Sequence, residues 1–269
     1  LVVIVIIGIL AGVIMISTSS SIDKANIAKL KIFEESIQNS LAVDTVSRWR
    51  LDGDAKDIWG NNHGTTIDVT FLNNSQCVTG ECASFNGSSS YIDCGNNSIL
   101  SANETTLTAW IKINALSDAH MRIFASKSTN KYPFTVGVSS GKLAFSDQNN
   151  VGSACTADAL DLDKWFFISV MSNGSQSSAI LYVNGKEQGK AGGGGFTFST
   201  KNVIGSYFSG TSASHFFNGS IDDVRIYNVA LSSSQIKQNY IAGLNSMLSN
   251  GNISKQEYNE RLSELAYEE

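Results

Sequence analysis

The chain has 269 residues, a length that corresponds to one or two domains. Only 16% of the residues are charged, with 19 basic against 24 acidic side chains and a net charge of −5. Proteins that bind nucleic acids need clustered Lys and Arg to contact phosphates, and no basic run occurs here, so we expect no nucleic acid among the partners.

The first sixteen residues, LVVIVIIGILAGVIMI, contain no polar side chain. Such a stretch suits a membrane or a protein core, and as a helix it spans roughly 24 Å, slightly less than the apolar part of a bilayer. From Ile22 to Leu41, apolar residues then recur every three or four positions, which indicates one apolar helix face. We therefore expect a continuous helix over residues 1–46 whose second half packs against the following domain.

Residues 1–14, LVVIVIIGILAGVI, resemble the N-terminal helix of bacterial and archaeal type IV pilins and pseudopilins. The resemblance implies a helix that is held in the membrane before assembly and then packs with copies of itself in a filament core. The hydrophobic residues and the acidic residue that usually precede this stretch are absent, so we expect residues before Leu1 to be missing. An ordinary membrane anchor is the alternative. The residues assigned to the filament core are Leu1, Ile4, Ile7, Gly8, Leu10, Gly12 and Ile14.

From Trp49 to about Asn228 the sequence consists of short β-type runs separated by turn residues. So many runs predict a sandwich of two sheets. Asn184-Gly185 favours a two-residue hairpin turn, because both residues tolerate positive φ angles. The expected strands include TTIDVTFL (65–72), LTAWIKI (107–113), WFFISVM (165–171), NVIGSYF (202–208) and SIDDVRIY (220–227).

Several segments together resemble the laminin-G-like, concanavalin A-like jelly roll. They are WRLDGDAKDIWGNNHGT (49–65), CASFNGSSSYIDC (82–94), LTAWIKI (107–113), DKWFFISV (163–170), LYVNGK (181–186) and FFNGSIDDVRIYNVALSSSQI (216–236). The resemblance implies a mainly β fold, a two-sheet antiparallel jelly-roll sandwich behind a long N-terminal α-helix, with short C-terminal helices. We accordingly divide the chain into residues 1–46, a hydrophobic and amphipathic helix, 47–230, the jelly roll, and 231–269, a helical tail.

The same resemblance implies a structural calcium ion, held by a carboxylate of a late strand and by groups of an early loop. It points to Asp222 with Asp57 and the turn at residues 60–62; Asp54 and Asp223 are additional candidates. Oxygen atoms of this kind are the ligands that calcium prefers. In the alternative, Asp57 is only a turn residue and Asp222 only a hydrogen-bonded carboxylate. The assigned calcium ligands are Asp57, Asn62 and Asp222.

Concave faces of this fold bind sugars through aromatic rings and polar side chains, so surface glycans or proteins are candidate partners. The candidate residues are Tyr132, Tyr207, Phe208, Asn149, Asn150 and His215. We expect no enzyme, because glycosidases of this fold carry closely alternating acidic residues along one strand and no such strand occurs here. The histidines His63, His120 and His215 have no serine or cysteine motif beside them.

The four cysteines indicate two disulfides and an oxidising compartment. Three connectivities are open; the short CVTGEC segment favours Cys77–Cys82, which leaves Cys94–Cys155. A zinc site is the alternative, although the cysteine spacing does not match a zinc knuckle. Seven Asn-x-Ser/Thr sites are also compatible with N-glycosylation: Asn73, Asn86, Asn96, Asn103, Asn173, Asn218 and Asn252.

The C-terminal tail is expected to form short helices. The first runs from Leu231 to Ala242, with Gly243 as a break, and Ser254 with Glu257 forms a capping box for the last helix. The apolar face of this last helix is expected to dock either on the sandwich or on a neighbouring subunit.

These features together predict the structural subunit of a type IV pilus-like extracellular filament. It is held in the inner or cytoplasmic membrane before assembly and displays a laminin-G-like domain for adhesion. The alternative function is a carbohydrate-binding adhesin, present as a minor or tip subunit or anchored in the membrane.

Overall fold

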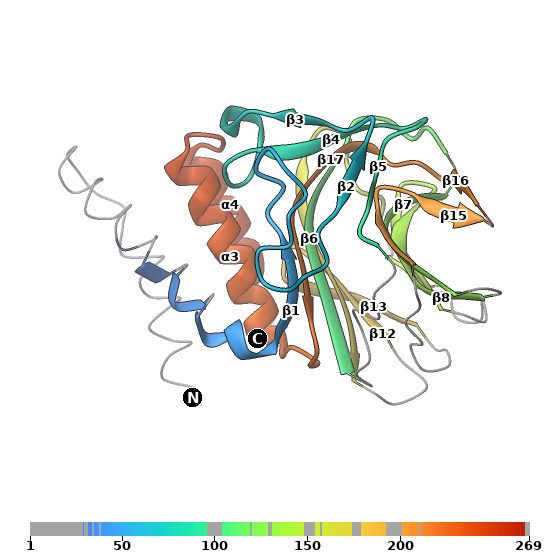
Figure 1. Cartoon of the computed structure of the whole chain (residues 1–269). Coiled ribbons are helices and arrows are strands. Elements are labelled where there is room, and N and C mark those ends of the chain that lie inside the picture. Colours follow the sequence, from blue (N-terminus) through green and yellow to red (C-terminus); the bar gives the residue numbers. More distant parts are fainter. Residues whose placement is uncertain are drawn as a thin grey trace.

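The computed structural model describes residues 29, 32–33, 35–37, 39–95, 104–118, 120–128, 131–147, 154–156, 158–173, 179–191, 201–209 and 211–266. Two antiparallel sheets pack face to face within this part of the chain, and helices cover the outer side of one of them (Figure 1). The predicted mainly β sandwich with short C-terminal helices is therefore confirmed. The residues assigned to the filament core, Leu1 to Ile14, lie outside the described residues.

The first sheet, which we call sheet A, has the strand order β13-β12-β11-β6-β17-β4-β3, with β1 paired to β17. β17 is central and buried along nearly its whole length. The strands of sheet A are β1 (Thr45–Trp49), β3 (Thr70–Leu72), β4 (Cys82–Asn86), β6 (Glu104–Ile113), β11 (Trp165–Asn173), β12 (Ala179–Val183), β13 (Lys186–Ala191) and β17 (Asn218–Tyr227).

The second sheet, sheet B, has the order β10-β9-β8-β7-β14-β5-β2. A separate hairpin, β15 (Tyr207–Ser209) with β16 (Ser212–Ser214), lies against β7. The strands of sheet B are β2 (Thr65–Ile67), β5 (Tyr91–Asp93), β7 (His120–Ser128), β8 (Lys131–Ser139), β9 (Lys142–Asp147), β10 (Ala154–Cys155) and β14 (Lys201–Ile204). The apolar inner faces of sheets A and B form the main core, which includes Trp49, Leu107, Phe124, Val136 and Ile226.

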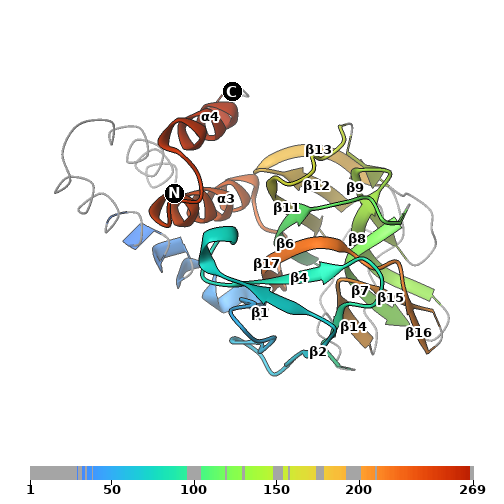
Figure 2. The same ribbon diagram turned by 90° about the horizontal axis from the view of Figure 1, so that it is seen from above.

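Sheet A is buried on both faces, because helices α3 (Ser233–Ser249) and α4 (Lys255–Ala266) cover its outer side (Figure 2). Tyr240 of α3 stacks on Trp110 of β6, with ring centroids 5.6 Å apart. Ile37 and Leu41, at the end of the N-terminal helical segment, are buried in the same cluster. The expectation that this segment packs one face on the domain is met for these two residues, and α4 docks on the sandwich of its own chain.

The structure corrects several expected boundaries. The N-terminal helical segment does not reach residue 46: a short 3-10 helix occupies Ala42–Asp44, and the chain then enters β1 and pairs with β17. The expected strand over 65–72 is divided between the two sheets by Asp68, whose φ is +49°. The run over 202–208 is likewise divided by Gly205, at φ +83°. The predicted hairpin turn is confirmed, since Asn184 and Gly185 have φ angles of +51° and +78° between β12 and β13.

Gly243 does not end a helix, contrary to expectation, and α3 continues through it to Ser249. A Cβ atom at Gly243 would lie 2.4 Å from Cζ2 of Trp110, so this glycine permits α3 to approach sheet A closely. The N-terminus of α3 is stabilised by a capping box between Ser232 and Gln235. None of the helices in the described part of the chain is long and apolar enough to span a bilayer.

Gly243→Ala should destabilise the fold by about 1–3 kcal/mol despite the higher helix propensity of alanine. The reason is that the Trp110 indole packs against both Phe167 and Tyr240, which also stack on each other, so the indole has little room to move. The measurement is urea unfolding of both proteins. As a control, the substitution should cost less in a Trp110→Phe background, which lacks the clashing indole atoms. Equal costs in the two backgrounds would contradict the close-approach explanation.

Candidate functional site

Asp57 organises the loop between β1 and β2. Its Oδ1 atom accepts hydrogen bonds from the backbone N–H groups of Arg48, Trp59 and Gly60, at 2.9, 3.0 and 2.9 Å. Its Oδ2 atom accepts from the backbone and side-chain nitrogens of Asn62, at 3.1 and 3.3 Å. Burial opposes ionisation, but these backbone hydrogen bonds hold the pKa of Asp57 below its ordinary value.

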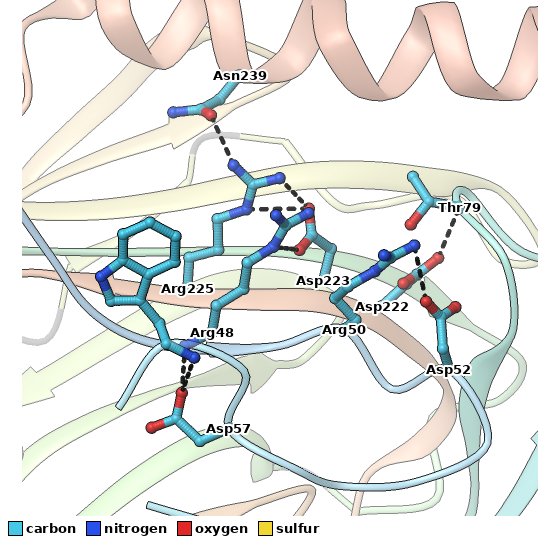
Figure 3. A network of polar contacts seen from close by, with 10 residues as sticks. Arg48, Arg50, Asp52, Asp57, Thr79, Asp222, Asp223, Arg225 and Asn239 are labelled. Carbon is cyan, nitrogen blue, oxygen red and sulfur yellow. Dashed lines mark hydrogen bonds and ion pairs between the residues drawn. The ribbon is translucent and has the colours of Figure 1, made fainter. Parts of the chain in front are cut away.

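Asp222 contacts a different loop. Its Oδ2 atom accepts a hydrogen bond from the backbone N–H group of Val78 at 2.9 Å. It also accepts one from the backbone N–H group of Thr79 at 3.0 Å (Figure 3). Its Oδ1 atom has no hydrogen-bond partner among the described residues. Complete burial raises the pKa of Asp222 well above its ordinary value, and the nearby carboxylate of Asp223 adds to this effect. Burial therefore favours the neutral form of the Asp222 carboxyl.

Asp223 is held between two arginines beneath α3. Arg48 Nε donates to its Oδ1 atom at 2.8 Å, and Arg225 donates to its Oδ2 atom through both Nε and Nη2. Arg225 Nη1 also reaches Asn239 of α3 at 3.3 Å. Although burial opposes it, the two guanidinium groups hold the pKa of Asp223 far below its usual range.

The assigned calcium ligands are thus only partly brought together. Asp57 and Asn62 bond each other, whereas Asp222 binds the loop at residues 78–79, and Asp54 forms an exposed ion pair with Lys56. In the described residues no group of three or more His, Cys, Asp or Glu side chains has a geometry that suits a metal. The structural calcium ion stays a prediction.

Cys77 and Cys82 form the predicted short disulfide, with both residues fully buried. The expected Cys94–Cys155 disulfide is not formed: Cys94 is a buried free thiol. Four strands of sheet B separate the strand that precedes Cys94 from the strand of Cys155, which amounts to roughly 24 Å at about 4.8 Å per strand. A disulfide needs Cα atoms within about 7 Å of each other.

The hairpin of β15 and β16 packs on β7 at the outer side of sheet B (Figures 1 and 2). A second group of polar side chains lies beside this hairpin. Asp118 contacts two histidines: its Oδ1 atom accepts from the backbone N–H of His120 at 2.9 Å, and its Oδ2 atom pairs with Nδ1 of His215 at 3.0 Å. The imidazole of His120 lies 3.0 Å from Ser139 Oγ of β8. The ring centroids of the two histidines are 6.1 Å apart, and the Tyr207 ring lies 6.2 Å from that of His215.

Aromatic rings continue from this group along the hairpin. Tyr91 of β5 meets Phe208 edge to face at 5.2 Å, and Phe216 lies 6.5 Å from Tyr91. Lys201 Nζ sits 3.9 Å above the Phe208 ring and pairs with Asp93 at 3.0 Å. We call the residues Tyr91, Asp118, His120, Ser139, Tyr207, Phe208, His215 and Phe216 the histidine–aromatic cluster. Its histidines, Asp118, Tyr91 and Phe216 remain partly exposed to solvent, while Tyr207 and Phe208 form its buried floor.

The backbone fixes this cluster before any ligand arrives. His215 has a φ of +54°, a conformation that costs a non-glycine residue of order 1 kcal/mol, and its carbonyl accepts from the backbone N–H of Arg122 at 2.9 Å. Partial burial opposes ionisation of Asp118, but the His120 N–H and the His215 ring hold the pKa of Asp118 below its ordinary value. The cluster therefore offers ionised and neutral hydrogen-bonding groups beside apolar rings.

The structure brings together three of the residues proposed for glycan contact, Tyr207, Phe208 and His215. Asn149 and Asn150 and the side chain of Tyr132 lie outside the described residues. Sequence reasoning missed Tyr91, Asp118 and His120 as partners of this cluster. The only local signal is the Asp-x-His spacing at 118–120, whereas the approach of β5 and β16 is a tertiary property.

The predicted glycosylation sites differ in their surroundings. Asn73 and Asn86 are exposed, but the Asn252 amide nitrogen already donates to the carbonyls of Asn74 and Cys77, at 2.6 and 2.7 Å. Asn218 is partly buried. Asn96, Asn103 and the side chain of Asn173 lie outside the described residues. Glycan attachment stays a prediction.

Comparisons with known proteins agree on the fold. A family model described as the concanavalin A-like lectin/glucanases superfamily matches residues 86–237. A search of curated proteins gives no match. Domain 4 of the extracellular arabinanase AbnA from Geobacillus stearothermophilus, solved with arabinotriose, is 18% identical, with a TM-score of 0.58 and coverage of 73% of this chain and 98% of that domain.

Binding domains of two toxins are also similar. That of Paraclostridial Mosquitocidal Protein 1 has 15% identity and a TM-score of 0.60, and covers 76% of this chain and 53% of its own. The binding domain of botulinum neurotoxin serotype D has 18% identity, a TM-score of 0.59 and coverages of 77% and 53%. At these identities the similarity concerns the fold.

Asp57→Asn and Asp222→Asn should have unequal effects on stability at pH 7. Asparagine at position 57 loses charge-assisted hydrogen bonds and should cost about 2–4 kcal/mol in urea unfolding. Asparagine at position 222 keeps an oxygen acceptor for the Val78 and Thr79 N–H groups and removes a carboxyl whose ionised form is disfavoured by burial, so it should not lower stability. Unfolding should be measured with calcium and with a calcium chelator. A large loss of stability in Asp222→Asn that appears only with calcium would contradict a neutral Asp222 carboxyl and support a bound calcium ion.

The pH dependence of folding stability follows from the pKa shifts of Asp57, Asp222 and Asp223. The pKa values of Asp57 and Asp223 are lowered on folding, so their stabilisation is complete above the unfolded value near 3.8 and is lost as the pH falls below it. The raised pKa of Asp222 has the opposite effect: the neutral carboxyl contributes its full stabilisation below pH 3.8. This stabilisation is lost as the pH rises from 3.8 through the pKa of the folded state. We expect the thermal midpoint to fall steeply below about pH 4, and the fall to be weaker in Asp57→Asn. An identical acid profile in both proteins would contradict this assignment.

Proposed function

This chain belongs to the concanavalin A-like lectin/glucanases superfamily, and we propose that it binds carbohydrate as a surface-attached adhesin through the histidine–aromatic cluster. The observation that carries the proposal is that Asp118 holds His120 and His215 beside partly exposed aromatic rings. A sugar has hydroxyl groups that donate and accept hydrogen bonds and C–H faces that pack on aromatic rings. The cluster provides both kinds of contact on one fixed surface.

Two further observations support this proposal. The domain of the arabinanase AbnA was solved with arabinotriose, and a similar structure of botulinum neurotoxin type C is described as depending on two ganglioside molecules for cell entry. The buried Cys77–Cys82 disulfide is typical of proteins outside the cytosol, where disulfides persist. The similar structures and the disulfide both support a glycan partner at the cell surface.

The N-terminal segment supports a second candidate function, a structural subunit of a pilus-like filament. Residues 1–16 are uniformly apolar, and Ile37 and Leu41 dock the following helical segment on the domain. In a filament, copies of the apolar segment would bury one another while the sandwich faced outward.

Carbohydrate binding is tested with the full chain in detergent against arabinan, xylan, β-glucan, mannan and a ganglioside. Tyr91→Ala and His215→Asn should each weaken binding at least tenfold, a loss of about 1.4 kcal/mol. Asparagine tolerates the left-handed backbone at position 215, so the variant should fold. Leu162→Ala, an exposed change outside the cluster, is the control. Unchanged binding in both Tyr91→Ala and His215→Asn would exclude the histidine–aromatic cluster as the carbohydrate-binding site.

The two candidate functions differ in where the chain is found. Electron microscopy of filaments sheared from cells, with mass spectrometry of the same sample, should find this chain scarce or at filament tips if it is an adhesin. A filament built from this chain along its whole length would instead establish a structural subunit, with sugar binding as a secondary property.

A further inference from the structure

We propose that Trp59 is a second carbohydrate contact, whose indole stacks on the apolar face of one sugar ring of a polysaccharide. This inference rests on the proposed function but concerns a different part of the molecule, the loop between β1 and β2. It assigns a role to an exposed side chain that neither the core nor the histidine–aromatic cluster uses.

Trp59 differs sharply in exposure from the other tryptophans. Trp49, Trp110 and Trp165 are 0%, 2% and 8% exposed, whereas Trp59 is 49% exposed, beside Ile58 at 50%. Burying a large apolar side chain contributes about 1.5–3 kcal/mol to folding. Trp59 gives only part of this stabilisation, because about half of its surface is exposed to solvent. The exposed ring is therefore available to a ligand.

The loop that carries Trp59 is fixed by contacts on both sides. Asp57 accepts the Trp59 and Gly60 N–H groups, and the Ile58 N–H donates to the Arg48 carbonyl of β1 at 2.9 Å. A Cβ atom at Gly60 would lie only 2.6 Å from the Val46 carbonyl, so the backbone is closely packed here. A ring held on a fixed backbone loses little conformational entropy on binding. This small cost favours the binding of a ligand, such as a sugar, that makes only weak contacts.

The surroundings of Trp59 favour a sugar over a protein or a bilayer. Only Ile58 and Trp59 form the apolar surface of the loop, and the neighbouring Lys56 and Asn61 are exposed and polar. A stable protein interface needs about 800 Å² per partner, far more than two side chains provide. A loop that exposes one indole together with the Asn61 amide and a Lys56 ammonium paired with Asp54 at 3.0 Å matches a sugar, which has apolar faces and a hydroxyl edge.

Tryptophan fluorescence tests this inference directly, because Trp59 is the one exposed indole among the four. Quenching by acrylamide is measured on the full chain in detergent, alone and with arabinan, xylan, β-glucan or mannan. We expect a bound polysaccharide to reduce the quenching constant at least twofold, and to do so in Tyr91→Ala as well once the polysaccharide concentration is raised at least tenfold to restore saturation. Trp59→Ala should lower the affinity for that polysaccharide at least fivefold, and Trp59→Phe should restore part of it.

The outcomes separate this inference from the proposed function. If Tyr91→Ala loses binding while quenching of Trp59 never changes, the proposed function stands and the second contact is refuted. If Trp59 is protected but Tyr91→Ala and His215→Asn bind normally, the second contact stands and the histidine–aromatic cluster is excluded as a carbohydrate-binding site. Protection by phospholipid vesicles but by no polysaccharide would overturn the inference in favour of membrane contact. If no glycan binds at all, both fail.

Discussion

The burial of sheet A on both faces is the constraint on which the rest of this structure depends. Its central strand β17 carries Asp222, Asp223 and Arg225 in an interior that gives charges little solvation. Asp223 meets this constraint by pairing with Arg225 of its own strand and Arg48 of β1, and Arg225 extends the network to Asn239 of α3 (Figure 3). Strand β1, the central strand and the covering helix are thus joined by one ionised group. Removing this carboxylate would take an ion pair away from each of two buried guanidinium groups.

The fold could be predicted from the sequence largely because alternation and turn chemistry are local properties. Strands such as β6 and β11 and the Asn184-Gly185 turn follow from neighbouring residues alone. Local patterns failed where a distant contact decides the conformation. A glycine such as Gly243 is typical of a helix end, but here it allows α3 to approach Trp110 closely. The Cys94–Cys155 pairing depends on the strand order in sheet B, which the spacing of cysteines along the chain does not determine.

The candidate sites show the same division. The resemblance points to Asp57 and Asp222 as calcium ligands, which stays a prediction. The structure gives both carboxyls hydrogen-bonding roles that no spacing reveals, and their pKa values shift in opposite directions. Both proposed sugar contacts are built in one way: a carboxylate accepts backbone N–H groups and so fixes a loop that carries rings. Asp57 does this for Trp59, and Asp118 does it for His120. Sequence alone identifies such an aspartate only as a turn residue.

The layered arrangement also determines the orientation of the molecule. Ile37, Leu41 and helices α3 and α4 all lie on the outer side of sheet A, whereas the histidine–aromatic cluster lies on the outer side of sheet B. Two sheets, whose centres are roughly 10 Å apart, therefore stand between the part of the chain that follows the N-terminal segment and the cluster. A domain tethered through that segment would turn its cluster away from the support, where a large, immobile ligand on another surface can reach it without steric conflict.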